Sequence, residues 1–270
     1  MREIQTLTPA DLTHVRGVFA DIDETISTQG RILPDAYEAL WRLARAGFKV
    51  VPVTGRAAGW CDHIARFWPV AAVVGENGGF YFYHDGEKLR RRYLDSPDQR
   101  AAYRAQLEAI RGEILAEVPG CAVASDQQYR EYDLAIDFCE DVPPLPREDV
   151  LRIQAIFHRH GAHAKISSIH VNGWFGDFDK LSTTRLCAHE LFGLDLDAEN
   201  EQFVFCGDSP NDEPMFAYFK FSFGMANVRP FLDLMRHAPA FVTTRPSGAG
   251  FVEVANLLLQ ARENQDTPHP

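Results

Sequence analysis

The chain has 270 residues, 46% of them hydrophobic and 24% charged, a globular composition with room for a core domain and a smaller second domain. Its 27 basic and 38 acidic residues give a formal net charge of −11, which disfavours nucleic acid or an anionic membrane as a partner. No uncharged segment is long enough to cross a bilayer, and the first fifteen residues lack an apolar signal core. We therefore expect a cytoplasmic protein.

The first part of the chain alternates between strand and helix patterns. Short apolar runs predict strands at residues 17–20, 48–53 and 71–74. Apolar residues at helical spacing predict helices from Pro34 to about residue 46 and from about residue 59 to residue 68. This rhythm indicates a parallel sheet with right-handed crossovers.

The rhythm changes near residue 84. Two short strands flank Asp85-Gly86, which predicts a hairpin. The following segments suggest a helix, a strand, a second helix, and one or two further strands, at 97–117, 132–139, 150–160 and 164–171. We expect residues 84–176 to form an α+β insert within a core made of residues 1–83 and 177–270.

The α/β rhythm then resumes, so the predicted fold class is α/β with a doubly wound parallel sheet. Helices are expected at 180–192, 210–218, 231–236 and 249–262, and strands at 202–206, 221–225 and 241–243. A polar tail, 263–270, is expected to fray at the end.

Polar residues follow the predicted strands. Ligands of open parallel sheets bind at the carboxyl ends of the strands, so these residues are expected to converge. In chain order, the groups are Asp21 and Asp23, then Thr54-Gly55-Arg56, then Glu76-Asn77-Gly78, and finally Gly207-Asp208-Ser209-Pro210-Asn211-Asp212. Lys180 begins the helix that precedes the last of these strands.

The aspartates in this set would repel one another in a single cleft unless a hard cation lay among them. Mg²⁺ takes oxygen ligands and keeps some of its waters. An ion held by Asp21, Asp208 and Asp212 would leave positions open for water and for a phosphate oxygen.

The remaining groups suggest phosphoryl transfer. Asp21 can attack phosphorus as a nucleophile, forming an aspartyl-phosphate. Asp23 can protonate the leaving oxygen and then deprotonate the attacking water. The Thr54 hydroxyl and the Lys180 ammonium can hold the other phosphate oxygens.

These motifs resemble those of haloacid dehalogenase (HAD) superfamily phosphatases. Asp21-Ile22-Asp23-Glu24-Thr25 is similar to their DxDxT signature, and Thr54-Gly55-Arg56 to their second motif. Lys180 resembles the third motif, and the segment from Gly207 to Asp212 the fourth, GDxxND. Glu76-Asn77-Gly78 is similar to a feature of class IIB, the Cof-type or sugar-phosphatase-like class.

The resemblance implies a Rossmann-like core, an α/β cap over 84–176, and Mg²⁺-dependent hydrolysis of a small phosphomonoester, with a sugar phosphate first among the candidates. It also implies that Gly55 binds phosphate and that the backbone carbonyl of Asp23 joins the metal ligands. Many class IIB members have Gly where this chain has Glu24, which adds a negative charge near the mouth of the site.

Other residues are candidates for substrate binding. Arg56 could contact phosphate or form a salt bridge within the core, and Asn77 could be a turn residue or line the site. Asn211 is a further candidate from the fourth motif. In the predicted cap, strand alternation places three polar side chains on one face, which either touches the leaving group or faces solvent. They are Ser168, His170 and Asn172.

Two other functions fit the same motifs. A phosphomutase would return the phosphoryl group to a sugar, and only the cap would distinguish it from a phosphatase. A non-catalytic sensor of a phosphate ligand usually lacks a motif residue, and the core set is complete here.

Overall fold

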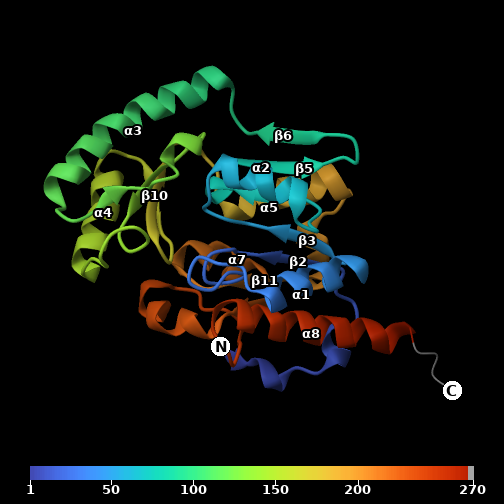
Figure 1. Ribbon diagram of the computed structural model, residues 1–270. Helices are drawn as coiled ribbons and strands as arrows, with labels where there is room; N and C mark the ends of the chain where they lie inside the picture. The colour runs from blue at the N-terminus through green and yellow to red at the C-terminus, as the bar shows by residue number, and fades with distance from the viewer. Residues whose placement is uncertain (267–270) are drawn as a thin grey trace.

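The computed structural model describes residues 1–266 and shows an α/β core with a second lobe at one end of its sheet (Figure 1). The core sheet has six parallel strands in the order β1-β13-β12-β11-β2-β3. From one edge to the other they are Arg2–Glu3, Phe241–Val242, Phe221–Gly224, Phe203–Gly207, Gly17–Ala20 and Lys49–Pro52.

Helices cover both faces of this sheet, as predicted for a doubly wound fold. One face packs against α1 (Pro34–Arg45), α2 (Ala58–Phe67) and α8 (Ser247–Asp266). The other packs against α5 (Lys180–Phe192), α6 (Leu196–Glu199) and α7 (Glu213–Tyr218). Successive side chains of a strand point to opposite faces of the sheet, which explains the two helix layers. Val18 and Phe19, for example, pack in the hydrophobic clusters on opposite faces. Burying each such side chain contributes roughly 1.5–3 kcal/mol.

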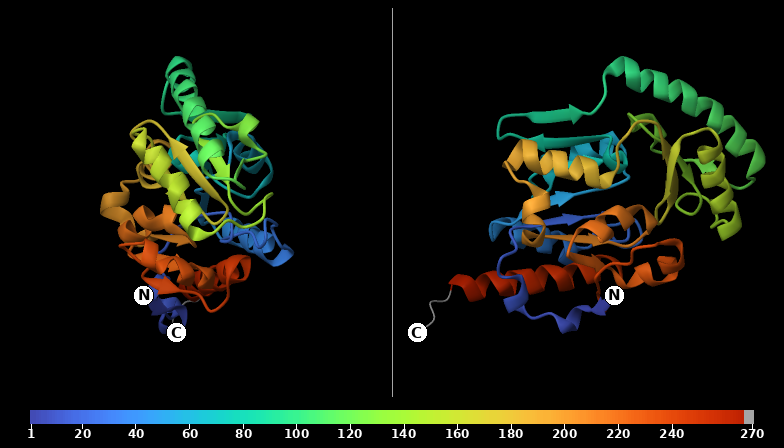
Figure 2. Two further views of the ribbon diagram at one scale, coloured as in Figure 1. Left: turned by 90° about the vertical axis from the view of Figure 1, so that its left-hand side faces the viewer. Right: turned by 180° about the vertical axis from the view of Figure 1, so that it is seen from behind.

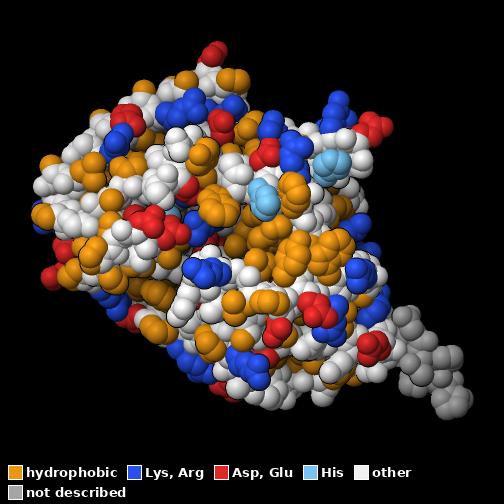
Figure 3. All heavy atoms as spheres, in the orientation of Figure 1, with side chains coloured by type: hydrophobic (Ala, Val, Ile, Leu, Met, Phe, Trp, Pro, Cys, Tyr) orange, Lys and Arg blue, Asp and Glu red, His pale blue; other side chains and the backbone are white. Residues whose placement is uncertain are grey.

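Helices α1 and α2 also carry apolar side chains on their outer surface. Figure 3 shows hydrophobic side chains gathered on one face of the molecule, in the region where Figure 1 places α1 and α2. Large exposed hydrophobic residues of this region are Leu33, Trp41, Trp60 and Phe67.

The third predicted strand belongs to a separate antiparallel sheet. β4 (Val73–Gly75) pairs with β5 (Phe80–His84), which pairs with β6 (Leu89–Tyr93). A single parallel bridge, Val53 to Val74, joins β4 to the end of β3. The hairpin predicted around Asp85-Gly86 is present, because Asp85 accepts the backbone N–H groups of the turn residues that follow it.

This hairpin lies with the core. Leu89 and Tyr93 of β6 pack against the same hydrophobic cluster as α1 and α2. The cap boundary predicted at residue 84 rests on the change of rhythm that begins there. We propose instead that the cap begins after Tyr93, where the chain leaves the hairpin.

The second lobe contains an antiparallel sheet in the order β7-β8-β10-β9. These strands are Ala122–Val123, Leu134–Asp137, His170–Trp174 and His163–Ile166, so the segment expected to hold one or two strands holds two. Two helices, α3 (Pro97–Glu117) and α4 (Arg147–Arg159), pack on one face of this sheet. The opposite face is turned to the core (Figure 2).

The remaining differences from the predicted elements are local. The helix expected at 210–218 begins as a 3₁₀ turn, η6 (Pro210–Asp212), which leads into α7, and the one expected at 231–236 is a longer 3₁₀ segment, η7 (Ala226–Leu234). The final helix continues to Asp266, and residues 267–270 of the predicted tail lie outside the described residues. Within residues 1–266, no helix combines the length and the apolar character needed to cross a membrane.

Candidate active site

Two aspartates meet where the central strands β2 and β11 end. Asp21 follows β2 and Asp208 follows β11, and Ala20 pairs with Cys206 in the ladder between these strands. The Asp21 N–H continues the ladder by donating to the Cys206 carbonyl at 2.8 Å. Both aspartates are buried, so the sheet itself holds two carboxylates side by side away from water.

Lys180 links two of the buried carboxylates. Its Nζ atom lies 2.7 Å from Oδ1 of Asp21 and 2.6 Å from Oδ1 of Asp212. Burial would lower the pKa of Lys180, but the two carboxylate charges outweigh it and raise that pKa, so the ammonium stays charged. Burial is also the main reason that the pKa of Asp21 rises to about 7, while Lys180 opposes that rise.

The position of Lys180 depends on a close contact with Gly78. A side-chain carbon on Gly78 would lie 2.2 Å from the Asp179 carbonyl oxygen, and Gly78 has φ +114°, so only glycine fits. Thr183 strengthens this contact by donating its hydroxyl hydrogen to the Gly78 carbonyl at 2.6 Å. The Glu-Asn-Gly segment therefore sets where α5 begins.

The donor set fits a hard divalent cation. Asp21, Asp208 and Asp212 each offer an oxygen within 4.8 Å of the others, and all three are buried. Lys180 offsets only part of their charge. Burial and the neighbouring carboxylates raise the pKa of Asp208 well above its usual range, the response expected of a buried acid that lacks a counter-charge. Oxygen ligands in this number suit Mg²⁺.

Asp212 has a second task beside its place in this cluster. Its Oδ2 atom accepts the backbone N–H of Asp208 at 2.9 Å and that of Ser209 at 3.3 Å. Both of its oxygens therefore have donors, Lys180 being the other. Asp212 therefore holds both the loop after β11 and the ammonium group of Lys180 in place, and it also adds negative charge to the cluster.

Asn227, which the sequence analysis did not select, holds Asp208 in place. Its Nδ2 atom donates to Oδ2 of Asp208 at 3.1 Å and to the carbonyl of Glu24 at 3.0 Å. The hydroxyl of Thr25 lies 3.5 Å from the other oxygen of Asp208. Asn227 lies between the strand expected at 221–225 and the helix expected at 231–236, so no sequence signal marks this residue.

The phosphate-clamp candidates lie at the end of β3. Thr54 is buried, and its hydroxyl oxygen accepts the Arg56 N–H at 3.0 Å. Gly55 lines the cavity beside Asp21, and a side-chain carbon there would approach the Asn77 amide within 3.2 Å. The Asn77 Oδ1 atom accepts from Asn211 at 3.2 Å, whereas its buried Nδ2 finds no acceptor among the described residues. An anion in this corner would satisfy that donor.

Asp23 is bound by Arg56, which resolves one of the two alternatives left open for the arginine. Arg56 Nε lies 3.0 Å from both Asp23 oxygens, and Nη2 lies 2.7 Å from Oδ1. Nη2 also donates to Oε1 of Glu140, in the cap, at 2.8 Å. Arg56 thus forms the predicted salt bridge within the core, to Asp23, and a second one to Glu140 of the cap.

Two of the three predicted cap residues face the small cavity beside Asp21. His170 and Asn172 alternate on β10, are buried, and line the cavity together with Asp21 and Asp23. Ser168 does not line it, because the chain turns between β9 and β10 and Ser167 takes the place next to the cavity. The predicted strand alternation therefore holds for His170 and Asn172 and is wrong for Ser168.

The cavity between these residues is nearly closed. Its volume is about 10 Å³, which is room for about one water molecule. Small-molecule sites typically enclose roughly 300–1,000 Å³. The cap must therefore move away from the core before a sugar-sized molecule can reach Asp21.

Glu24 occupies the position where glycine is commoner in class IIB, and its backbone shows why. Its φ is +54°, the left-handed region that glycine adopts without strain. Its carboxylate accepts the Gln29 N–H at 2.6 Å and the Ser247 hydroxyl at 2.7 Å. The Glu24 carboxylate is therefore hydrogen-bonded by other groups, and Glu24 is not among the residues that line the small cavity beside Asp21.

A buried polar network fastens the cap to the core beside the site. Glu76, fully buried in the core, accepts the backbone N–H groups of Glu131, Tyr132 and Asp133, at 2.6–3.2 Å. Arg130 of the cap donates to the Gly55 carbonyl at 2.9 Å and to Asp133. The cap is thus attached on the side of the loop that follows β3.

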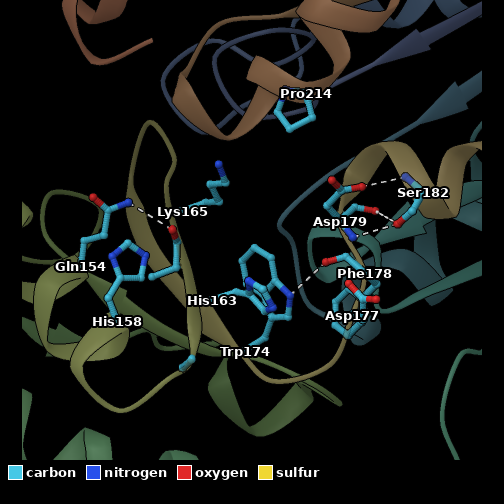
Figure 4. A pocket seen from close by; sticks show the side chains of 12 residues that line it. Gln154, His158, His163, Lys165, Trp174, Asp177, Phe178, Asp179, Ser182 and Pro214 are labelled. Atoms are coloured by element: carbon cyan, nitrogen blue, oxygen red, sulfur yellow. Dashed lines mark hydrogen bonds between the residues drawn. The ribbon is translucent and has the colours of Figure 1, made fainter. Parts of the chain in front are cut away.

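A larger cavity lies on another side of the cap, where the chain returns to the core (Figure 4). Its volume is about 520 Å³, and it shares no lining residue with the small cavity beside Asp21. Lys165 points into it from β9, and Asp179 and Ser182 border it from the start of α5. None of the predicted site residues lies in its wall.

Known proteins share this architecture. Thermoplasma acidophilum protein 0175 matches with a TM-score of 0.68 and 20% identity, over 91% of this chain and 99% of that one. A HAD/COF-like hydrolase from Plasmodium vivax matches with a TM-score of 0.64 and 17% identity, over 93% and 96%. The sucrose-phosphatase of Synechocystis, solved with sucrose and phosphate, matches with a TM-score of 0.62 and 14% identity, over 90% and 97%.

The chain has a haloacid dehalogenase-like fold. Its parallel core and inserted cap confirm the architecture that the four motifs predicted. No model of a known protein family matches the chain, and no curated protein sequence does either. Because identities at this level establish the fold alone, the chemistry of this haloacid dehalogenase-like chain has to be argued from its own residues.

Proposed function

We propose that this chain is a Mg²⁺-dependent phosphatase that hydrolyses a small phosphomonoester, with Asp21 as its nucleophile. The observation that carries the proposal is the buried cluster at the strand ends, in which Lys180 lies between Asp21 and Asp212 and Asp208 completes a set of oxygen donors. Such a cluster retains excess negative charge without a cation. A bound Mg²⁺ would neutralise that charge and draw electron density from a phosphate oxygen.

The first chemical step forms a bond between an Asp21 carboxylate oxygen and phosphorus, and breaks the bond between phosphorus and the leaving oxygen. Asp23 gives a proton to the leaving oxygen. Lys180 and the hydroxyl of Thr54 stabilise the negative charge on the phosphoryl oxygens. The Asn77 Nδ2 group, which lacks an acceptor in the part of the chain that the structure describes, is suited to donate a hydrogen bond to another phosphoryl oxygen.

The second step releases phosphate. A water molecule attacks phosphorus, Asp23 takes a proton from it, and the bond from phosphorus to Asp21 breaks. Inorganic phosphate leaves, and both aspartates return to their starting states.

The closed cap supports a small substrate with a polar leaving group. His170 and Asn172 line the same cavity as Asp21 and Asp23, so a leaving group enclosed there would meet hydrogen-bonding groups. Sucrose-phosphatase and a trehalose-6-phosphate phosphatase related protein are among the structures that share the fold. We therefore place sugar phosphates first among the substrates, and the net charge of −11 suits a small metabolite better than nucleic acid.

The test is phosphate release from a panel of sugar phosphates, nucleotides and 4-nitrophenyl phosphate, with Mg²⁺ and with EDTA. We expect release that requires Mg²⁺ and is abolished in Asp21→Asn, whereas Asp11→Asn, an exposed site, serves as the matched control. Transfer of the phosphoryl group between sugars without net release would indicate a mutase. Binding of phosphate esters with neither reaction would indicate a sensor.

A further inference from the structure

One guanidinium nitrogen joins the cap to the acid/base residue. Nη2 of Arg56 lies 2.8 Å from Oε1 of Glu140 and 2.7 Å from Oδ1 of Asp23. Glu140 belongs to the cap, whereas Arg56 and Asp23 belong to the core. This chain of contacts can therefore form only while the cap lies against the core.

Glu140 is presented by a fixed loop. Asp137, at the end of β8, accepts the backbone N–H groups of Cys139, Glu140 and Asp141 at 2.8–2.9 Å, and Asp137 is itself buried. The second oxygen of Glu140 lies 3.0 Å from Nε2 of His170. The loop thus holds the Glu140 carboxylate at one position, between His170 and Arg56.

Arg56 is restrained from its other sides as well. Its guanidinium lies 5.2 Å from the centre of the Trp60 ring, and it contacts both oxygens of Asp23. A planar guanidinium held by two carboxylates and an aromatic ring has little freedom to rotate. The orientation of Asp23 then follows that of Arg56.

We infer that Glu140 is a positioning residue, which sets Arg56 and through it the carboxylate of Asp23 when the cap closes. This inference rests on the proposed function. Glu140 would complete the acid/base group at the moment when the leaving group is enclosed, which is how closing lids commonly assemble a catalytic site. When the cap opens, Arg56 loses this contact and Asp23 loses its fixed orientation.

The role predicts a particular dependence on the leaving group. Proton donation matters most when the leaving oxygen is strongly basic, as in an alkyl phosphate, and little when it is a good leaving group, as in 4-nitrophenyl phosphate. Losing the positioning residue should therefore slow the alkyl ester much more than the aryl ester. A residue that only stabilises the cap would affect both to a similar extent.

The experiment compares Glu140→Ala, Glu140→Gln and a control, Asp141→Asn, an exposed carboxylate of the same loop. The substrates are the alkyl phosphate that the wild-type chain hydrolyses fastest and 4-nitrophenyl phosphate, both with Mg²⁺. For Glu140→Ala we expect kcat/KM, which reports the step in which the leaving group departs, to fall about ten-fold or more on the alkyl ester and to stay within about two-fold on the aryl ester. Glu140→Gln, which keeps the accepting oxygen, should fall between Ala and the wild type.

An equal fall in kcat/KM on both esters, or no change in kcat/KM on either, would overturn the inference. Thermal unfolding of each variant shows whether the fold is intact, and the aryl rate shows whether the nucleophile still works. If the wild-type chain hydrolyses neither ester, the proposed function fails and the inference fails with it.

Discussion

The ammonium of Lys180 lies 2.7 Å from the carboxylate of Asp21, and both groups are buried. Replacing Lys180 with Met would leave Asp21 and Asp212 without their shared cation. We expect kcat to fall by at least about 100-fold, as when a preorganised charge partner is lost, and stability to fall by about 3 kcal/mol. Steady-state kinetics and denaturant unfolding of Lys180→Met would measure both effects.

Lys165→Met is the matched control for this substitution. Lys165 is half-buried in the wall of the larger cavity and has no ion-pair partner within residues 1–266. Its loss should change kcat by less than about two-fold, since none of the catalytic carboxylates depends on it. Similar losses in the two variants would mean that Lys180 has no special role.

The stabilisation given by Mg²⁺ should grow as pH rises. The pKa of Asp21 in the metal-free fold is about 7, against an ordinary value of 3.8, so the folded state binds more protons than the unfolded state between these values. The metal-free fold therefore loses stability as pH rises through this window. A divalent cation needs ionised ligands and removes that cost. We expect the difference in Tm between Mg²⁺ and EDTA to increase from pH 5 to pH 8, and a constant difference would argue against a metal at Asp21.

Glu24 gives a test that is independent of catalysis. Glu24→Ala loses the hydrogen bonds to Gln29 and Ser247, at about 1 kcal/mol each, and keeps the positive φ. Glu24→Gly loses the same bonds but relieves about 1 kcal/mol of backbone strain. Denaturant unfolding should therefore rank the wild type above Gly and Gly above Ala, with kcat within about two-fold. Equal stability of the two variants would show that the left-handed backbone carries no cost.

The attachment of the cap at Glu76 should dominate the stability of the lobe interface. Glu76→Ala would leave several buried N–H groups of residues 131–133 without an acceptor, which we expect to cost about 3 kcal/mol or more. Hydrogen exchange should then accelerate at residues 131–133 first. Glu131→Ala, which removes a partly exposed side chain and keeps the backbone, is the control. Unchanged exchange in Glu76→Ala would contradict this account of the attachment.

The sequence was most informative where a local pattern fixes the structure. The helix expected at 97–117 has the same bounds as α3, whose N-terminus is capped by Ser96 and begins with Pro97. Asp21 and Asp208 were placed together because each ends a strand of the same parallel sheet. Such inferences need no knowledge of contacts between distant segments.

The contacts between cap and core lay beyond the reach of the sequence. Arg56 and Glu140 are 84 residues apart, and no local pattern says which cap loop meets which core loop. Ser168 shows a related difficulty, since strand alternation fails once a turn begins and the facing side chain becomes that of Ser167. The hairpin pattern of residues 84–93 does not say whether its apolar side chains meet a cap or a core, so the sequence alone leaves the cap boundary within this segment.

The most direct test of the central claim is to identify the residue that becomes phosphorylated. A radiolabelled substrate is mixed with the wild-type chain and Mg²⁺, quenched in acid within the first turnover, and the labelled peptide is mapped. We predict that label is found on Asp21, that it is lost in Asp21→Asn, and that it decays as phosphate appears. Label on another residue, or undiminished phosphate release by Asp21→Asn, would contradict the account.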